Sequence, residues 1–62
     1  MTQYRIILVG EGGRELGSGY LFSSDDDSAR ASAERLMGSS PQAVAVHVRD
    51  GDRLVCSFER AA

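Results

Sequence analysis

The sequence of 62 residues predicts an α+β fold with the chain order ββαββ, in which one helix packs on one face of a four-stranded antiparallel sheet. Three observations lead to this fold. Apolar residues recur at every second position in four segments, as in strands. Between the second and third segments the apolar period becomes helical. Gly-rich or Asp-Gly turns separate the strands of each pair. The strand segments are residues 3–9, 15–22, 43–49 and 53–59, the helical segment is 25–37, and all belong to one domain, 1–62.

The glycines after the first strand predict a hairpin. A three-residue loop at 11–13, with Gly13 in the left-handed conformation, sets Tyr4 opposite Tyr20 and gathers the apolar side chains on one face. A two-residue loop would set Tyr4 opposite Leu21 and divide them, so we favour the longer loop. In this register the helix side of the sheet receives all four aromatic residues, which are Tyr4, Tyr20, Phe22 and Phe58.

The same glycines do not form a nucleotide-binding loop. Gly10 and Gly12 fit the first two positions of G-x-G-x-x-G, but the third position is Glu15 and a strand follows instead of a helix. The sequence contains no lysine, which excludes a P-loop. The glycines are therefore read as turn residues.

The helical segment has capping residues at both ends. Ser24 or Asp25 can cap the start, and the acidic cluster 25–27 suits the positive end of the helix dipole. Gly38 is expected to end the helix, and Pro41 to prevent its continuation. The stripe expected to face the sheet is Ala29, Ala33, Leu36 and Met37.

The last two strands form a second predicted hairpin. A loop at 49–51, with Gly51 left-handed, sets Val46 opposite Leu54 and keeps the apolar residues on one face. A right-handed crossover through the helix then gives the strand order 2-1-3-4. The order 2-1-4-3 is the main alternative.

Composition argues against several functions. The net charge of −2 argues against electrostatic capture of nucleic acid or an anionic membrane by the whole molecule. Cys56 and His47 are the only residues of their kinds, and strand parity puts them on opposite faces, so neither a metal site nor a nucleophile–base pair is expected. We expect no cofactor, no catalytic residue and no enzyme. The N-terminus lacks the apolar region of a signal peptide, and the lone cysteine suits a reducing cytoplasm.

The sheet face away from the helix is the expected interaction surface. It should present apolar residues from all four strands with basic residues around them, and such a cluster is typical of an interface. A domain of this size also needs an additional source of stability, and self-association is the one left. The expected interface residues are Ile7, Val9, Leu21, Val55, Arg5, His47, Arg49 and Arg53.

Three stretches, "YRIILV", "DDDSARASAERL" and "GDRLV", give the sequence a resemblance to a group of short bacterial proteins, many of them alphaproteobacterial. The resemblance implies a ββαββ fold and brings no activity or functional residue. The stretch "AVHV" departs from the pattern, because a Trp or another large residue is expected there.

These observations predict a cytoplasmic, non-enzymatic interaction module. Its expected partner is a second copy of itself, bound through the open sheet face or an edge strand, or else another protein. The alternative is nucleic-acid binding by the arginines of the open face, against which stand the net charge and the lack of aromatic residues expected there.

Overall fold

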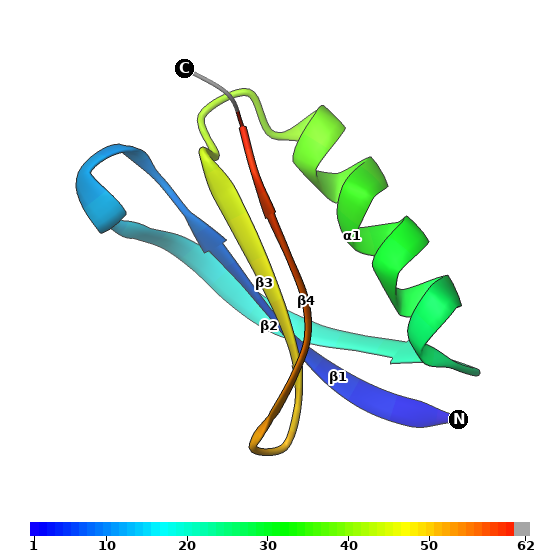
Figure 1. The fold of residues 1–62 in the computed structure, drawn as a ribbon. Helices are drawn as coiled ribbons and strands as arrows, with labels where there is room; N and C mark the ends of the chain where they lie inside the picture. The colour runs from blue at the N-terminus through cyan, green and yellow to red at the C-terminus, as the bar shows by residue number, and fades with distance from the viewer. Residues whose placement is uncertain (61–62) are drawn as a thin grey trace.

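A computed structural model describes residues 1–60 and confirms the ββαββ fold (Figure 1). Four antiparallel strands form one sheet in the order β2-β1-β3-β4, and α1 packs across one face. The alternative order 2-1-4-3 is wrong. The elements are β1 (Thr2–Val9), the short 3-10 helix η1 (Glu11–Gly13), β2 (Glu15–Ser23), α1 (Asp26–Ser39), β3 (Ala45–Asp50) and β4 (Arg53–Glu59).

The register between β1 and β2 differs from the prediction. Tyr4 pairs with Leu21, not with Tyr20, and the register shifts at a bulge between Leu8 and Val9. The predicted left-handed Gly13 is present, with φ of 82°. The bulge inserts Leu16 as an extra residue on β2, and this lets both leucines of that strand pack against the helix-side core.

Because of this register, the two aromatic residues of β2 do not lie in the core. Directly paired residues lie on the same face of an antiparallel sheet, so Tyr20 and Phe22 lie on the face away from α1 with their partners Arg5 and Gln3. They are 65% and 61% exposed. Their predicted place on the helix side is wrong.

The second hairpin has a similar shift. β3 and β4 are joined by the two residues Gly51 and Asp52, and Gly51 has the predicted left-handed φ. Arg49 pairs with Leu54 and Val48 with Cys56, so Val55 is the extra residue of a second bulge. The predicted loop at 49–51 and the pairing of Val46 with Leu54 are therefore wrong.

The helix begins as predicted but ends later. The Asp25 carboxylate accepts a hydrogen bond of 2.8 Å from the backbone N–H of Ser28 and caps the first turn. The helix runs through Gly38, which does not end it. The Arg60 guanidinium contacts this end of the helix. It donates to the helix carbonyl Met37 O at 2.6 Å, and to Pro41 O at 3.3 Å and Ser40 O at 3.4 Å in the segment that follows.

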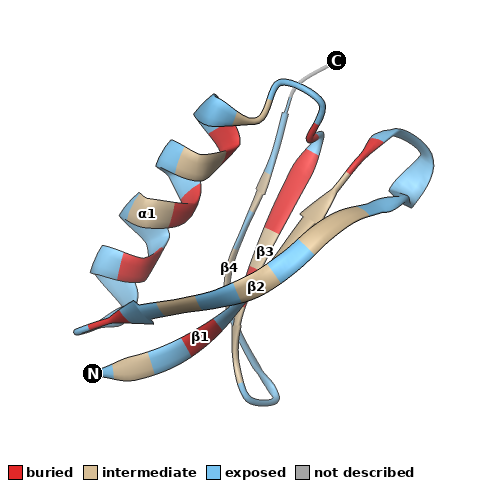
Figure 2. Cartoon of the chain, turned by 180° about the vertical axis from the view of Figure 1, so that it is seen from behind, coloured by how far each residue is buried: buried red, intermediate tan, exposed pale blue. Residues whose placement is uncertain are grey.

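The core lies between α1 and the helix side of the sheet (Figure 2). The helix contributes small residues, Ala29 and Ala33, which are fully buried and let its backbone lie close to the sheet. Val46 and Val48 on β3 are also fully buried, and Tyr4 is nearly so. The core is thin because few large side chains fill it. Partly buried residues at its border include Leu8, Leu21, Leu36, Val55, Cys56 and Phe58.

Candidate interaction face

The face of the sheet opposite α1, here named the open face, is organised in rows that run across the strands. In an antiparallel sheet, directly paired residues lie side by side on one face. The register therefore defines three complete rows. The basic row is Tyr20–Arg5–Arg49–Leu54, the central row is Ser18–Ile7–His47–Ser57, and the acidic row is Glu15–Val9–Ala45–Glu59.

The basic row joins positive charge to exposed apolar surface. Arg5 and Arg49 are direct cross-strand partners, and like charges in that position destabilise a sheet. Among residues 1–60, neither forms an ion pair with a carboxylate. Arg49 donates one hydrogen bond of 3.0 Å, to the backbone oxygen of Asp52. Tyr20 and Leu54 lie at the two ends of the row, and Leu54 is 52% exposed.

The acidic row gives the open face a direction. Val9 and Ala45 are its apolar centre, and Glu15 and Glu59 lie outside them on the two edge strands. One central row separates the two arginines from the two glutamates, so basic and acidic rows are about 13 Å apart along the strands. The open face is therefore charged with opposite sign at its two ends.

Five of the eight residues expected at the interface lie on the open face, and three do not. Arg5, Ile7, Val9, His47 and Arg49 follow strand parity as expected. Leu21 packs against the core because the bulge at Leu16 reverses the parity of β2 beyond it, and Val55 packs there as the extra residue of its own bulge. Arg53 pairs with Asp50 and lies on the helix side. The sequence reasoning missed Tyr20, Phe22 and Leu54 for the same reason.

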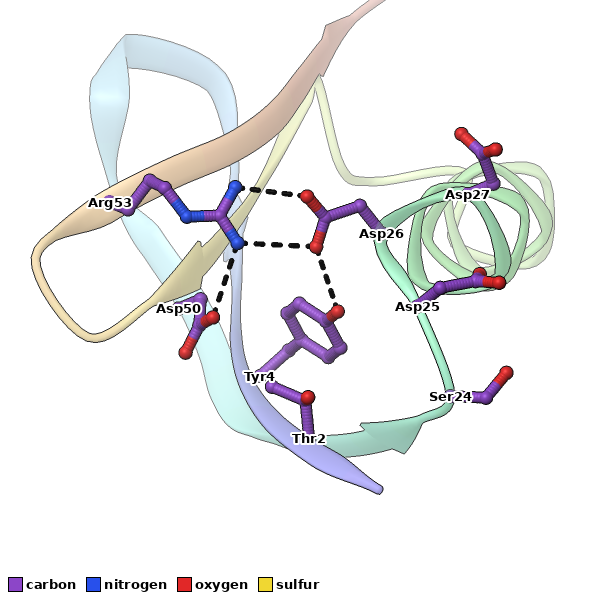
Figure 3. Close-up of a pocket in the computed structure, with 8 residues that line it drawn as sticks. All are labelled: Thr2, Tyr4, Ser24, Asp25, Asp26, Asp27, Asp50 and Arg53. Carbon is purple, nitrogen blue, oxygen red and sulfur yellow. Dashed lines mark hydrogen bonds and ion pairs between the residues drawn. The ribbon is translucent and has the colours of Figure 1, made fainter.

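Arg53 belongs to a polar network that joins the sheet to the start of α1 (Figure 3). Its guanidinium holds the Asp26 carboxylate in a two-pronged contact, with Nη1–Oδ2 at 2.9 Å and Nη2–Oδ1 at 3.2 Å. Asp50 accepts from the same guanidinium at 3.2 Å, and the Tyr4 hydroxyl donates to Asp26 at 2.8 Å. The network fixes the helix N-terminus over β1, β3 and β4.

The protonation of this network follows from its contacts. Hydrogen bonds from Arg53 and then from Tyr4 lower the pKa of the Asp26 carboxyl. Burial, reinforced by the hydrogen bond to Asp26, raises the pKa of the Tyr4 hydroxyl. The carboxylate contacts raise the pKa of Arg53. Asp26 is therefore held as an anion and Tyr4 as a neutral hydrogen-bond donor, which are the states that keep the start of α1 attached to the sheet.

The pocket around this network has a volume of about 450 Å³. Among the described residues, no group of three or more His, Cys, Asp or Glu side chains is placed to hold a metal ion. In the pocket, Asp26 and Asp50 already accept from Arg53, and Asp25 caps the helix. Figure 3 shows the Asp25 and Asp27 side chains pointing away from Arg53. The acidic cluster is therefore explained by capping and by the network.

A second, more apolar pocket of about 310 Å³ lies at the other end of the molecule. Leu8 and Leu16 line it on the sheet side, and the turn after α1, residues 40–42, completes it. Gly10 borders it closely, since a Cβ at that position would lie 2.8 Å from Leu16 Cδ2. The pocket exposes part of the core.

Cys56 is a free, partly buried thiol on the helix side of β4. Burial raises the pKa of the thiol, and this outweighs the opposite effect of the nearby Arg30 charge. His47 lies on the other face of the sheet. The thiol is thus without an activating imidazole within the part of the chain that the structure describes.

Comparison with known proteins adds no family to this description. A scan against protein-family models and searches of curated proteins and of solved structures found no match. Within residues 1–60, the one α-helix is too short and too polar to cross a membrane.

Proposed function

We propose that the protein is a non-enzymatic interaction module that forms a homodimer through its open face. The observation that carries the proposal is the exposure of large side chains on this face. Tyr20, Phe22 and Leu54 are 65%, 61% and 52% exposed, and Ile7 and Val9 lie between their strands. Exposed apolar clusters drawn from several strands are typical of association surfaces.

The thin core supports the same proposal. A domain of this length buries only about 60% of the surface of its unfolded chain, and association is one way to compensate. A standard interface buries about 800 Å² per partner, which is roughly a fifth of the 4169 Å² of accessible surface of this chain.

Two features favour the open face over the sheet edges. Both edge strands, β2 and β4, carry a bulge, at Leu16 and Val55. Bulges twist and interrupt an edge, and proteins use them to discourage strand-to-strand pairing. We therefore place the second copy on the face and not on an edge.

The test is the molar mass of the purified protein by light scattering after size exclusion, over a dilution series. Wild type is expected to be a dimer. The Ile7→Asp variant is expected to be a folded monomer, because dimerisation would bury its new carboxylate at the centre of the contact. Ala31→Asp adds the same charge at an exposed position of α1 and is expected to stay dimeric. A monomeric wild type at all concentrations, or a dimeric Ile7→Asp variant, would refute the proposal.

A second candidate function is single-stranded nucleic-acid binding by the same face. The observation that favours it is the place of Tyr20 and Phe22, which are exposed beside Arg5 on β1. Exposed aromatic rings stack on unpaired bases, and arginines contact phosphates. The net charge of −2 stands against strong capture.

This second candidate is tested with a fluorescently labelled single strand at several salt concentrations. Binding that weakens steeply with salt and is lost in a Tyr20→Ala variant would support it. A strand whose fluorescence polarisation does not change at low salt would exclude it.

A further inference from the structure

The rows of the open face define how a second copy would lie on it. We propose that two chains pack face to face with their strands antiparallel, so that Arg5 and Arg49 of each lie against Glu15 and Glu59 of the other. This inference rests on the proposed homodimer and adds its orientation. Two sheets packed in this way are about 10 Å apart, a distance that an arginine and a glutamate can bridge together.

The symmetry follows from the order of the three rows. The two-fold axis runs along the central row, in the plane between the two sheets. It reverses the strand direction of the second chain and places each strand over the same strand of that chain. Ile7 then faces Ile7 of the second chain, and the basic row faces the acidic row. Arg5 lies over the partner's Val9, with the partner's Glu15 one strand away.

The other half of the contact follows by the same operation. Arg49 lies over the partner's Ala45, with the partner's Glu59 one strand away. Small or medium apolar residues under each arginine leave room for its aliphatic stem, and the guanidinium reaches the carboxylate beside it. Each dimer contains this arrangement twice because the interface is isologous.

The competing two-fold axis is excluded by charge. An axis along the strands, instead of across them, places β1 over the partner's β3. Arg5 then faces the partner's Arg49 and four guanidinium groups meet, since the two arginines are already neighbours within each chain. Like charges brought together in an interface are strongly unfavourable. The axis across the strands replaces that repulsion by four opposite-charge contacts.

The proposal also explains the direct pairing of Arg5 with Arg49. Within one chain this pair is unfavourable, and no carboxylate in residues 1–60 compensates it. In the proposed dimer each arginine receives a carboxylate from the second copy. The second copy therefore compensates the repulsion between Arg5 and Arg49 that a single chain leaves unbalanced.

The experiment is a pair of charge-reversed variants, Arg5→Glu/Arg49→Glu and Glu15→Arg/Glu59→Arg. Each keeps like charges at the reversed positions of its own row, so repulsion within that row is matched to wild type, and circular dichroism checks the fold. Each variant alone should dimerise about 100-fold more weakly than wild type, since four attractive contacts become repulsive. Mixed in equal amounts, the two should form a heterodimer of near wild-type affinity.

The outcomes separate the orientation from the dimer itself. A monomeric wild type refutes the proposed function, and with it this inference. A dimeric wild type whose two variants also dimerise normally refutes the orientation alone. Variants that are both weakened but do not recover on mixing refute the pairing of arginines with glutamates. Weakening of each variant alone, followed by recovery in the mixture, supports it.

Discussion

The buried Val46, the second residue of β3, gives a direct test of how far the core extends along the helix side of that strand. Val46 is fully buried, whereas Val44, two residues earlier on the same chain segment, is 37% exposed. The substitution Val46→Ala removes two buried carbons, each contributing about 0.8 kcal/mol, and leaves a small cavity. We expect it to lower the free energy of unfolding by about 2 kcal/mol.

The expected change in melting temperature is large because the domain is small. An unfolding entropy of about 2.1 cal/mol/K per residue gives roughly 130 cal/mol/K for 62 residues. A loss of about 2 kcal/mol therefore lowers Tm by about 15 °C. The assay is thermal unfolding followed by circular dichroism at one fixed protein concentration, because dimerisation makes Tm depend on concentration.

Val44→Ala is the matched control, since it removes the same two carbons from a position that is partly exposed. Its expected loss is below about 1 kcal/mol, because part of this side chain already contacts water. Equal shifts of Tm for the two variants, or a shift below about 3 °C for Val46→Ala, would refute the assignment of the core.

Three further predictions concern the ends of the elements. Gly10→Ala should lower the free energy of unfolding by about 1 kcal/mol, because the new methyl displaces Leu16, and denaturant titration should show no further loss when it is added to Leu16→Ala. Arg60→Gln should lower Tm by about 8 °C in a thermal melt, since the helix C-terminus loses a charged donor worth about 1 kcal/mol. Asp26→Asn should be less stable than wild type at pH 7. Because the pKa of Asp26 is lowered in the folded state, its ionised carboxylate stabilises the fold at pH values above its ordinary pKa of 3.8. This stabilisation is lost as the pH falls through the folded-state pKa, so the difference between wild type and variant should vanish in urea titrations at acid pH.

The order of elements could be predicted from the sequence because it depends on local patterns. Period-2 segments, a helical stripe of alanines and left-handed glycines each specify their own element. The right-handed crossover then restricts the strand order. Asp25 as the helix cap and Gly13 and Gly51 as turn residues follow from side-chain chemistry, and the structure has all three.

The register could not be predicted because a bulge has no strong sequence signature. One extra residue in β2 exchanges Tyr20 for Leu21 on the core side. A signal exists in retrospect, since Leu16 and Leu21 lie an odd number of positions apart and cannot both face the core of a regular strand. The run of Leu54, Val55 and Cys56 gives the same signal on β4.

The candidate interaction face was affected by these two bulges. Its members on the bulge-free strands β1 and β3 were predicted with the correct face, including Ile7 and His47. Its aromatic members on β2, Tyr20 and Phe22, were predicted on the other face. The bulge places them on the open face, so the argument that this face lacks exposed aromatic rings no longer holds. Arg53 was misplaced for the same reason, because the bulge at Val55 changes the face on which the start of β4 lies.

The contact between Arg60 and the end of α1 has a consequence for folding during synthesis. As the chain leaves the ribosome from its N-terminus, β1, β2 and α1 emerge first, but the buried valines of β3 and the last helix cap follow. The β1–β2 hairpin alone is marginally stable in water. The core therefore cannot be completed before β3 and β4 have emerged, and the contact of Arg60 with the end of α1 is made last.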